Sequence, residues 1–362
     1  MTDLKEAPPA QHAVRDKHAV GTNLPRRSPD LSRPTALQRR IASFRFTGRL
    51  LLHSLVVFVT VFFFATLITY ALQDLSGLSP AQFRFEDGGT VEQIRALEAQ
   101  WGLDRPFIVQ YLDWLGNVLR GDFGNSWYNG ASIAELLSSR AAISISAAGV
   151  ALVFGVVFGF ALGALAAKYQ TSPLDRGITA FTTFISTMPA FVVGIALVMV
   201  FAVWLGWFPS AGYVPIERGG FSVWLLHITL PALALSFDTI ADVARQLRTG
   251  LVQAQRENYV VGATVRGLSP RRIFWVHILR NGSGPSLTIL GMKFPALLGG
   301  AVVTERIFGL NGYGAFAADS ATRGDVPAVQ AVLVVAVVLV VTFNLLVNLL
   351  LVRLSPASAR GI

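Results

Sequence analysis

The stretch Glu257-Asn-Tyr-Val-Val-Gly-Ala-Thr-Val-Arg-Gly267 lies between two apolar runs, residues 224–240 and 287–303, that are candidates to cross a lipid bilayer. The arginine-rich segment around it, residues 242–285, shows helical spacing, and Gly267 is suited to end a helix there. Polar helices held between two membrane spans offer a docking surface to a soluble partner. The pattern therefore predicts a helical membrane protein with a docking loop.

The composition also indicates a membrane protein. Of the 362 residues, 53% are hydrophobic and 14% are charged, whereas about a quarter of the residues in soluble domains are charged. The net charge of +9 does not indicate nucleic-acid binding, because the arginines gather at the ends of apolar runs, as the positive-inside rule describes. The absence of cysteine excludes disulfides, thiolate metal sites and a cysteine nucleophile.

Six apolar runs predict about six transmembrane helices and an all-α, polytopic fold. The runs are residues 50–72, 141–167, 178–205, 224–240, 287–303 and 328–352. An even number of spans places both termini on one side of the membrane. Because most basic residues fall in the segments on that side, we expect both termini to be cytoplasmic.

The segments outside and between these runs define the expected parts of the chain. They are a basic disordered cytoplasmic tail (1–45), a first transmembrane helix (46–73), an extracytoplasmic subdomain (74–140), a five-helix transmembrane core (141–356) that includes the cytoplasmic loop 242–285, and a C-terminal tail (357–362). Within the external subdomain, residues 91–101 and 106–119 show helical spacing, and Gly121-Asp-Phe-Gly124 predicts a closing turn.

No catalytic constellation is present in the sequence. A phosphate-binding loop requires Gly-Lys-Ser/Thr, and none of the four lysines, Lys5, Lys17, Lys168 and Lys293, follows a glycine. The five histidines, among them His53, His227 and His277, lack metal-ligand spacing. We therefore expect no enzyme active site, no metal and no cofactor in this chain.

Two ionisable residues fall inside apolar runs, Asp238 and Lys293. Charged residues at such depth are commonly functional, so we expect them to face a water-filled pathway and to pair with each other. The alternative is that Lys293 extends along its own stem to the cytoplasmic interface. Gly291, Gly299 and Gly300 in the fifth run are wall residues of a pore or packing residues, and we favour packing.

From Trp101 to the C-terminus, the chain resembles the permease subunits of ATP-binding cassette (ABC) importers for dipeptides, oligopeptides and nickel, specifically the first (B-type) permease of the pair. The external segment shares Gly102-Leu-Asp-Arg-Pro106 and Gly121-Asp-Phe-Gly124 with that family. The loop shares Tyr259-Val260, Ala263, Gly267-Leu-Ser269, Arg271-Arg272 and His277, and Glu305, Gly312, Asp325 and Pro327 follow in the same order. Departures occur at residues 73–80 and 355–357, where the family carries Pro-Gly-Asp-Pro and Asp-Pro-Arg.

The resemblance implies a type I ABC importer permease fold in a bacterial plasma membrane. It also implies four kinds of partner: a second homologous permease, two ABC ATPases that carry ATP and magnesium, an extracytoplasmic substrate-binding protein, and membrane lipid. The residues expected to couple the chain to the ATPases are Glu257, Tyr259, Val260, Ala263, Arg266, Gly267, Leu268, Ser269, Arg271 and Arg272. Tyr259 and Val260 are expected to be the buried anchors of that interface.

The residues expected to contact the binding protein are Trp101, Asp104, Tyr111, Trp114 and Phe123. The function that follows is ATP-driven import of di- or oligopeptides by alternating access, with the exact cargo set by the binding protein. Two alternatives remain at the level of sequence. One is a stand-alone secondary transporter or channel that uses Asp238 and Lys293, and the other is a membrane anchor whose glycine-rich spans tolerate substitutions such as Gly300→Leu.

Overall fold

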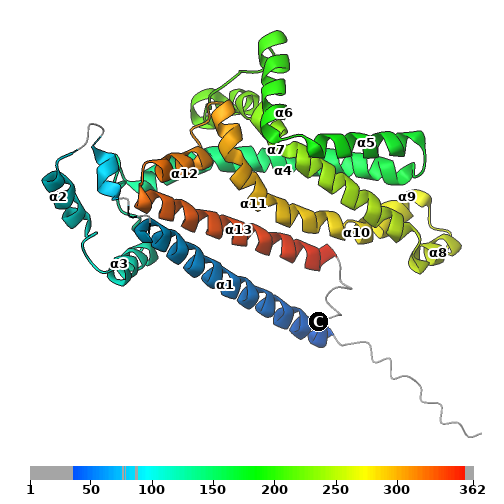
Figure 1. Cartoon of the computed structure of the whole chain (residues 1–362). Helices are drawn as coiled ribbons and strands as arrows, with labels where there is room; N and C mark the ends of the chain where they lie inside the picture. The colour runs from blue at the N-terminus through cyan, green and yellow to red at the C-terminus, as the bar shows by residue number, and fades with distance from the viewer. Residues whose placement is uncertain (1–35, 76, 78, 86–88, 355–362) are drawn as a thin grey trace, which may run out of the picture. The chain divides into compact units, whose positions relative to one another are not determined.

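The computed structural model describes residues 36–75, 77, 79–85 and 89–354. The chain divides into two units, Met1–Ser43 and Phe44–Ile362, and the contacts below are those of the second. The helices are α1 (Ala36–Leu75), η1 (Pro80–Arg84), α2 (Val91–Trp101), α3 (Phe107–Leu119), α4 (Ile133–Lys168), α5 (Pro173–Thr187), α6 (Ala190–Leu197), η2 (Val198–Trp204), α7 (Ile216–Gln255), α8 (Asn258–Val265), α9 (Pro270–Arg272), η3 (Ile273–Ile278), α10 (Leu279–Gly282), α11 (Gly284–Ile307), α12 (Tyr313–Thr322) and α13 (Val326–Leu354) (Figure 1).

The all-α prediction is confirmed for the described residues, which contain no strand and only an isolated bridge between Asn125 and Ser132. Of the predicted tail 1–45, residues 1–35 lie outside the described part, and α1 begins at Ala36, earlier than expected. The predicted tail 357–362 lies outside the described part altogether.

Within the described ranges, five helices are long and apolar enough to cross a membrane. They are Leu51–Gln73, Ile133–Lys168, Ile216–Gln255, Gly284–Ile307 and Val326–Leu351. Each contains or closely overlaps one of the predicted runs. The chain is therefore a multi-pass membrane protein, because an α-helix satisfies its own backbone hydrogen bonds in lipid.

The third predicted run, residues 178–205, is not a straight helix. It is split between α5 and the segment Ala190–Trp204, which meet at an angle of 101°. Met188 adopts an extended conformation (φ −81°, ψ 125°) because a residue before proline is disfavoured in the helical region, and Pro189 starts α6. Counting the bent pair as one span gives six.

The most extensive helix pairing is that of α4 with α7. Gly155, Gly159 and Gly163 lie on one stripe of α4, and a Cβ on Gly163 would lie 2.7 Å from the Ala244 carbonyl oxygen. Thr239 and Val243 of α7 occupy the equivalent space beside the other two glycines. Small residues four apart let two membrane helices approach at backbone distance, which is how lipid-embedded helices associate without a hydrophobic driving force.

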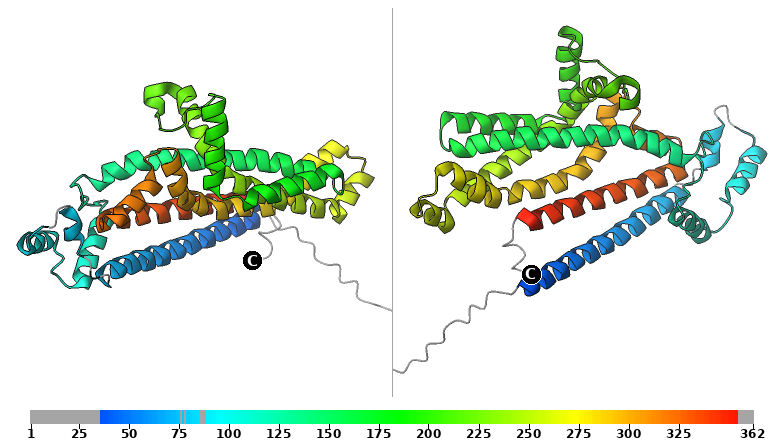
Figure 2. Two further views of the ribbon diagram at one scale, coloured as in Figure 1. Left: turned by 45° about the horizontal axis from the view of Figure 1, so that its top comes forward. Right: turned by 180° about the vertical axis from the view of Figure 1, so that it is seen from behind.

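Other helices join this pair. A core cluster unites α4 and α7 with α11, through Ala148, Ile228 and Leu297 among others. Figures 1 and 2 show α13 alongside α1, and Gln330 of α13 donates to the Thr66 carbonyl oxygen of α1 at 3.1 Å. Only 6% of the most apolar stretch of α1 is buried, so most of its surface is not covered by the rest of the chain.

The segment that we predict to be external, and call the external subdomain, forms the two helices that the sequence predicts. A capping box at Thr90 and Gln93 starts α2, and Gly102 ends it with φ 69°. On α3, Tyr111 is 3% exposed, and its hydroxyl lies 3.0 Å from the Thr66 hydroxyl of α1. The subdomain is thus attached to the first span.

The contact between α7 and α10 yields a stability prediction. A Cβ on Gly250 would lie 2.1 Å from the Gly282 carbonyl oxygen, and a backbone atom cannot move away cheaply. We expect Gly250→Ala to destabilise the chain by about 1–3 kcal/mol, measured as a lower midpoint of thermal unfolding in detergent. Gly149→Ala on α4, where a Cβ meets open space, is the matched control, and equal midpoints for both variants would contradict the close approach.

Candidate functional site

The loop between the fourth and fifth spans folds into a compact group of short helices. α7 ends at Gln255, and α8 follows after a two-residue break. Gly267 adopts φ +75°, a left-handed conformation that ends α8 as its position in the sequence predicts. Ser269 then caps α9, where its hydroxyl accepts a hydrogen bond from the Arg272 backbone N–H. Figure 1 shows these helices together at one end of the membrane helices.

One side of α8 packs against the rest of the chain. Ala263 is fully buried, and Val260 and Leu268 join it against Leu251 of α7 and Ile273. Tyr259 is half-buried, and burial raises the pKa of its hydroxyl. Val260, Ala263 and Leu268 therefore hold α8 in place. Tyr259 and Val260 are both partly buried, and Val260 packs within the chain, so their role as anchors for a partner stays a prediction.

Other parts of the loop expose apolar side chains. Val261 is 59% exposed and Val265 is 82% exposed, one helical turn apart on α8. Trp275 and Val276 on η3 are also exposed. The charged and small residues expected in coupling share this exposure: Glu257, Arg266, Gly267, Ser269, Arg271 and Arg272. We call Val261, Val265, Trp275 and Val276 the apolar loop surface.

Charged residues form a second feature, on α7. The Lys293 ammonium of α11 pairs with the carboxylate of Asp238 and lies 2.5 Å from that of Asp242, which also pairs with Arg245. The predicted pairing of Asp238 with Lys293 is confirmed, and the sequence did not reveal Asp242 as a further partner. Lys293 is 17% exposed and Asp238 is 55% exposed, so the cluster is open on the Asp238 side.

The same face of α7 continues with Arg248. Its guanidinium binds the Asp175 carboxylate of α5 through two contacts of 2.6 Å, and Asp175 is 4% exposed. Arg245 donates to the Ser186 hydroxyl, also on α5, at 3.1 Å. The ionisable groups of α7 thus bind α5 on one side and α11 on the other. We call Asp238, Asp242, Arg245, Lys293, Asp175 and Arg248 the α7 charge network.

The glycines of the fifth span differ in their surroundings. A Cβ on Gly291 would lie 3.1 Å from the Asn344 side-chain oxygen of α13, so this glycine serves packing, as favoured. Gly299 and Gly300 are exposed and face open space. Packing within this chain therefore does not explain why positions 299 and 300 are glycine.

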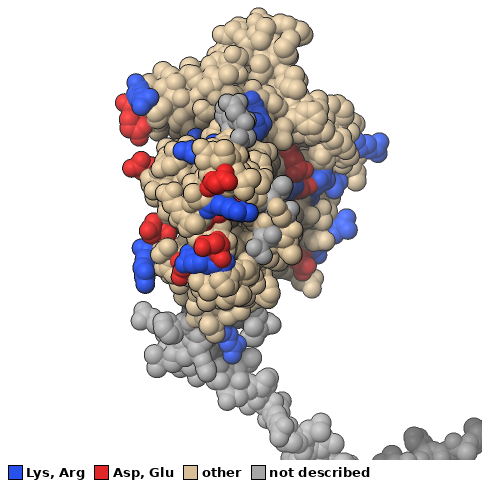
Figure 3. All heavy atoms as spheres, turned by 60° about the vertical axis from the view of Figure 1, so that its left-hand side comes forward, with Lys and Arg blue, Asp and Glu red and all other residues tan. Residues whose placement is uncertain are grey.

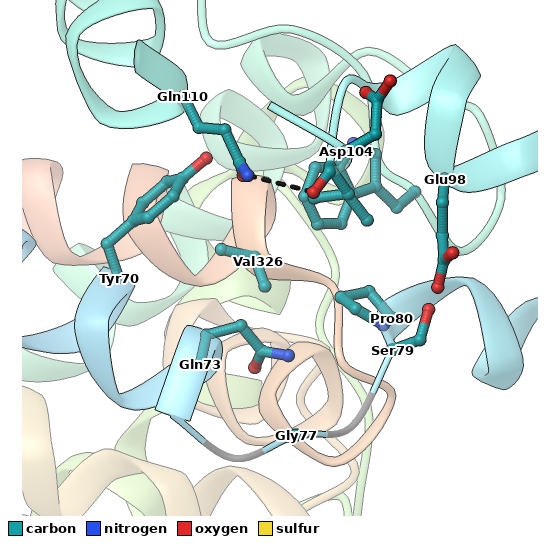
Figure 4. A pocket seen from close by; sticks show the side chains of 11 residues that line it. Tyr70, Gln73, Gly77, Ser79, Pro80, Glu98, Asp104, Gln110 and Val326 are labelled. Atoms are coloured by element: carbon teal, nitrogen blue, oxygen red, sulfur yellow. Dashed lines mark hydrogen bonds between the residues drawn. The ribbon is translucent and has the colours of Figure 1, made fainter. Parts of the chain in front are cut away.

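The external subdomain contains a cavity of about 260 Å³. Figure 4 shows Tyr70 and Gln73 of α1 opposite Glu98 of α2, with Gln110 donating to the Leu103 carbonyl oxygen. Asp104 also lines this cavity, and Trp101 stacks on Trp127 beside it at 4.9 Å between ring centres. On the face that carries α2 and α3, charges of both signs are scattered (Figure 3), which is unlike a nucleic-acid-binding surface.

The five residues expected to contact a binding protein are placed unequally. Asp104 is exposed, and Trp101, Trp114 and Phe123 are partly buried. Trp114 packs on Tyr70 and Tyr111, and Phe123 packs beside Ile133 and Tyr313. Tyr111 is buried against α1 and has almost no surface to offer, so its predicted role in partner contact is wrong.

The family of binding-protein-dependent transport system inner membrane components matches residues 159–360. The chain belongs to this family. The match includes the loop between α7 and α11, the whole α7 charge network, and helices α11, α12 and α13.

Full-length relatives support the assignment. A probable peptide ABC transporter permease of Sinorhizobium fredii is 33% identical over 309 residues, which cover 85% of this chain and 98% of the relative. The oligopeptide transport system permease AppB of Bacillus subtilis is 36% identical, with 71% and 82% covered, and the di/tripeptide transport system permease DppB of Pseudomonas aeruginosa is 33% identical, with 81% and 93% covered. This chain is therefore a permease of the B type.

The fold agrees with a solved transporter. The structure of the MetNI methionine ABC transporter in inward-facing conformations aligns with a TM-score of 0.50 at 16% identity, over 61% of this chain and 97% of that one. At this identity the similarity shows the fold alone, which is that of type I ABC importer permeases.

Sequence reasoning on this permease missed Val261, Val265 and Trp275. A signal for the first two was present, because positions 261 and 265 share one helical face while positions 260 and 263 fall on another. Deciding which of these faces turns outward requires knowing how α8 packs on α7. That packing is a tertiary contact, so it cannot be deduced from the local sequence of α8.

The α7 charge network yields a second prediction. Lys293→Met leaves two membrane-embedded carboxylates with Arg245 as the remaining cation, so we expect a loss of about 2 kcal/mol or more in the free energy of unfolding. Lys293→Arg keeps the charge and is expected to retain most of the stability. Thermal unfolding in detergent measures both, with Lys168→Met, at an exposed lysine, as the control. A Met variant as stable as the wild type would show that Lys293 does not hold α7 to α11.

Proposed function

We propose that this permease is one of two membrane subunits of an ATP-driven importer of di- or oligopeptides. It pairs with a second, homologous permease, and two ABC ATPases that bind ATP and magnesium dock on its cytoplasmic loop. An extracytoplasmic binding protein delivers the peptide, and both termini lie in the cytoplasm of a bacterial cell. The relatives named as peptide permeases over most of their length support this assignment of cargo class.

The apolar loop surface is the observation that carries the proposal. Exposed apolar side chains on a polar loop mark a site that another protein covers, and Val265 at 82% exposure is the most exposed of them. Glu257, Arg266, Arg271 and Arg272 of the same loop are also exposed and supply charges that select the partner. We assign Val261 and Val265 as the anchors, in place of Tyr259 and Val260.

The coupling step follows from the connection between the loop and the spans. α8 is fixed to the end of α7 by Ala263, Val260 and Leu268, so movement of α8 with the ATPases moves α7. The α7 charge network passes that movement to α5 and α11. ATP binding thus shifts the population towards the outward-open state, which receives peptide from the binding protein.

The proposed peptide pathway includes residues of the fifth span, α11. Lys293 and Asp238 remain our proposed pathway residues, since Asp238 is half-exposed and offers a carboxylate to the charged ends of a peptide. Gly299 and Gly300 add a small-residue wall on the same helix. Substrate choice among di- and oligopeptides belongs to the binding protein.

The decisive experiment purifies the tagged chain from its native cells under mild conditions. We expect a second permease and ATPase subunits to co-purify, and ATP-dependent peptide uptake after reconstitution into liposomes. If the chain purifies alone and moves solute without ATP, it is instead a secondary transporter or channel in which Asp238 and Lys293 carry the ion or proton. If Gly300→Leu retains full assembly and no transport is found with any solute, an anchoring role replaces both.

A variant pair tests the anchors. Val265→Asp places a charge in the proposed interface but leaves the inner packing untouched, so we expect the ATPases to be lost from the complex at an unchanged unfolding midpoint. Tyr259→Ala removes inner packing, so we expect a lower midpoint. The amounts of co-purified ATPase and the thermal midpoint are measured for both. Gln170→Asp, an exposed position in the turn before α5, is the charge control, and retention of the ATPases by Val265→Asp would contradict the assignment.

A further inference from the structure

Two nearly inaccessible carboxylates lie at the two ends of the short helix α12. Glu305, on the last turn of α11, is 1% exposed, and Asp325, in the connection to α13, is 3% exposed. Figure 1 shows α12 between the end of α11 and the start of α13. Burial of a carboxylate is costly unless its oxygens are well paired, so the partners of these two groups indicate what they hold together.

Glu305 holds the first turn of α12. Its carboxylate accepts a hydrogen bond from the Ala315 backbone N–H at 2.7 Å and another from the Ser144 hydroxyl of α4. The Ser144 oxygen in turn accepts from the Tyr313 backbone N–H at 2.7 Å. A negative charge at a helix N-terminus is favourable. This group of hydrogen bonds, which we call the Glu305 node, thereby joins α4, α11 and α12.

The Glu305 node is too tightly packed to accept a side chain at Gly312. A Cβ on Gly312 would lie 2.3 Å from Oε1 of Glu305 and 2.7 Å from the Ser144 oxygen. The Arg140 guanidinium of α4 lies 4.7 Å from the ring centre of Phe316 on α12. The N-terminal end of α12 is therefore fixed in position and direction relative to α4 and α11.

Asp325 holds the other end of α12 to the external subdomain. Its backbone N–H donates to the Ser320 carbonyl oxygen of α12 at 2.9 Å. Its carboxylate accepts from the Ser126 hydroxyl at 2.5 Å and from the Trp127 backbone N–H at 3.0 Å. The Arg323 guanidinium lies 4.2 Å from the ring centre of Tyr128 on the same turn.

The turn that Asp325 binds also contacts the outermost helix. Trp127 stacks on Trp101 at the end of α2, with the two rings 6° from parallel. Trp127 and Val326 both line the external cavity of Figure 4. A displacement of the external subdomain is therefore applied directly to Asp325, and through α12 to Glu305.

We propose that α12 is a strut that transmits binding-protein docking on the external subdomain to α4 and α11, and that Asp325 and Glu305 are its positioning residues. From α11 the route continues through Lys293 to α7 and so to α8. The inference rests on the proposed function, since it requires a binding protein outside and ATPases inside. It adds the residues by which the outer partner signals to the inner ones.

The partners of the two carboxylates favour transmission over simple packing. For stability alone, apolar residues of similar volume serve a buried site as well as a charged group does, or better. Both carboxylates instead bind backbone N–H groups of another segment, which sets the direction of that segment as well as its distance. A rigid element fixed at both ends moves as one body when either end is displaced.

The test uses the reconstituted complex and the binding protein that co-purifies with it. ATP hydrolysis is measured without and with the peptide-loaded binding protein, together with its affinity for the complex. For Asp325→Asn we expect stimulation of hydrolysis to fall by about fivefold or more, with basal hydrolysis within about twofold of wild type. A merely structural defect lowers basal and stimulated hydrolysis together.

Further variants keep the test decisive if Asp325→Asn folds poorly. Ser126→Ala removes one hydrogen bond to Asp325 and leaves its charge, and Glu305→Gln alters the opposite end; both are expected to reduce stimulation. If the two ends serve one route, Asp325→Asn combined with Glu305→Gln reduces stimulation no further than the stronger single variant. Asp319→Asn, on the exposed face of α12 where Asp319 pairs with Arg306 at 2.5 Å, is the matched control and retains stimulation.

The outcomes separate the strut from the proposed function. If folded Asp325→Asn and Ser126→Ala complexes are stimulated as strongly as wild type, the strut is overturned and the importer assignment stands. If variants lose stimulation only because the binding protein no longer binds, the residues serve docking and transmission through α12 is overturned. If the wild-type complex itself does not respond to any binding protein, the proposed function fails, and the strut fails with it.

Discussion

Backbone-level contact between α4 and α7 is the constraint on which the rest of the structure depends. In lipid, the hydrophobic effect does not drive two apolar helices together, so their association relies on close packing. The stripe of Gly155, Gly159 and Gly163 makes that packing possible by leaving room for Thr239 and Val243. The α7 helix is thereby fixed as the central element, and α5, α10 and α11 attach to it through ion pairs and a further glycine contact.

Much of the fold follows from local rules, because lipid imposes helix length and helix hydrophobicity directly. The five long spans, the helices α2 and α3, and the end of α8 at Gly267 were predictable on that basis. Pro189 was a signal for the break at Met188, yet the apolar run on either side of it suggested a continuous span. A length criterion alone cannot distinguish a straight span from a bent pair.

The candidate sites were predictable only in part, because their geometry depends on contacts between distant segments. Lys293 and Asp238 were recognisable as membrane-embedded charges, but the second bond from Lys293 to Asp242 depends on the register of α11 against α7. Val260 packs partly against the rest of the chain, whereas Val261 next to it is exposed, and only the packing of α8 on α7 decides which face turns outward. Aromatic residues of the external segment suggested partner contact, whereas Tyr111 uses its ring and hydroxyl to fasten α3 to α1.

The α7 charge network has an electrical consequence. Its three acidic groups, Asp175, Asp238 and Asp242, are matched by three basic groups, Arg245, Arg248 and Lys293. Moving one elementary charge through a membrane potential of 100 mV changes the free energy by about 2.3 kcal/mol. A network of zero net charge that moves as a unit crosses the field at no such cost. The network itself therefore adds no voltage-dependent cost to a movement of α7.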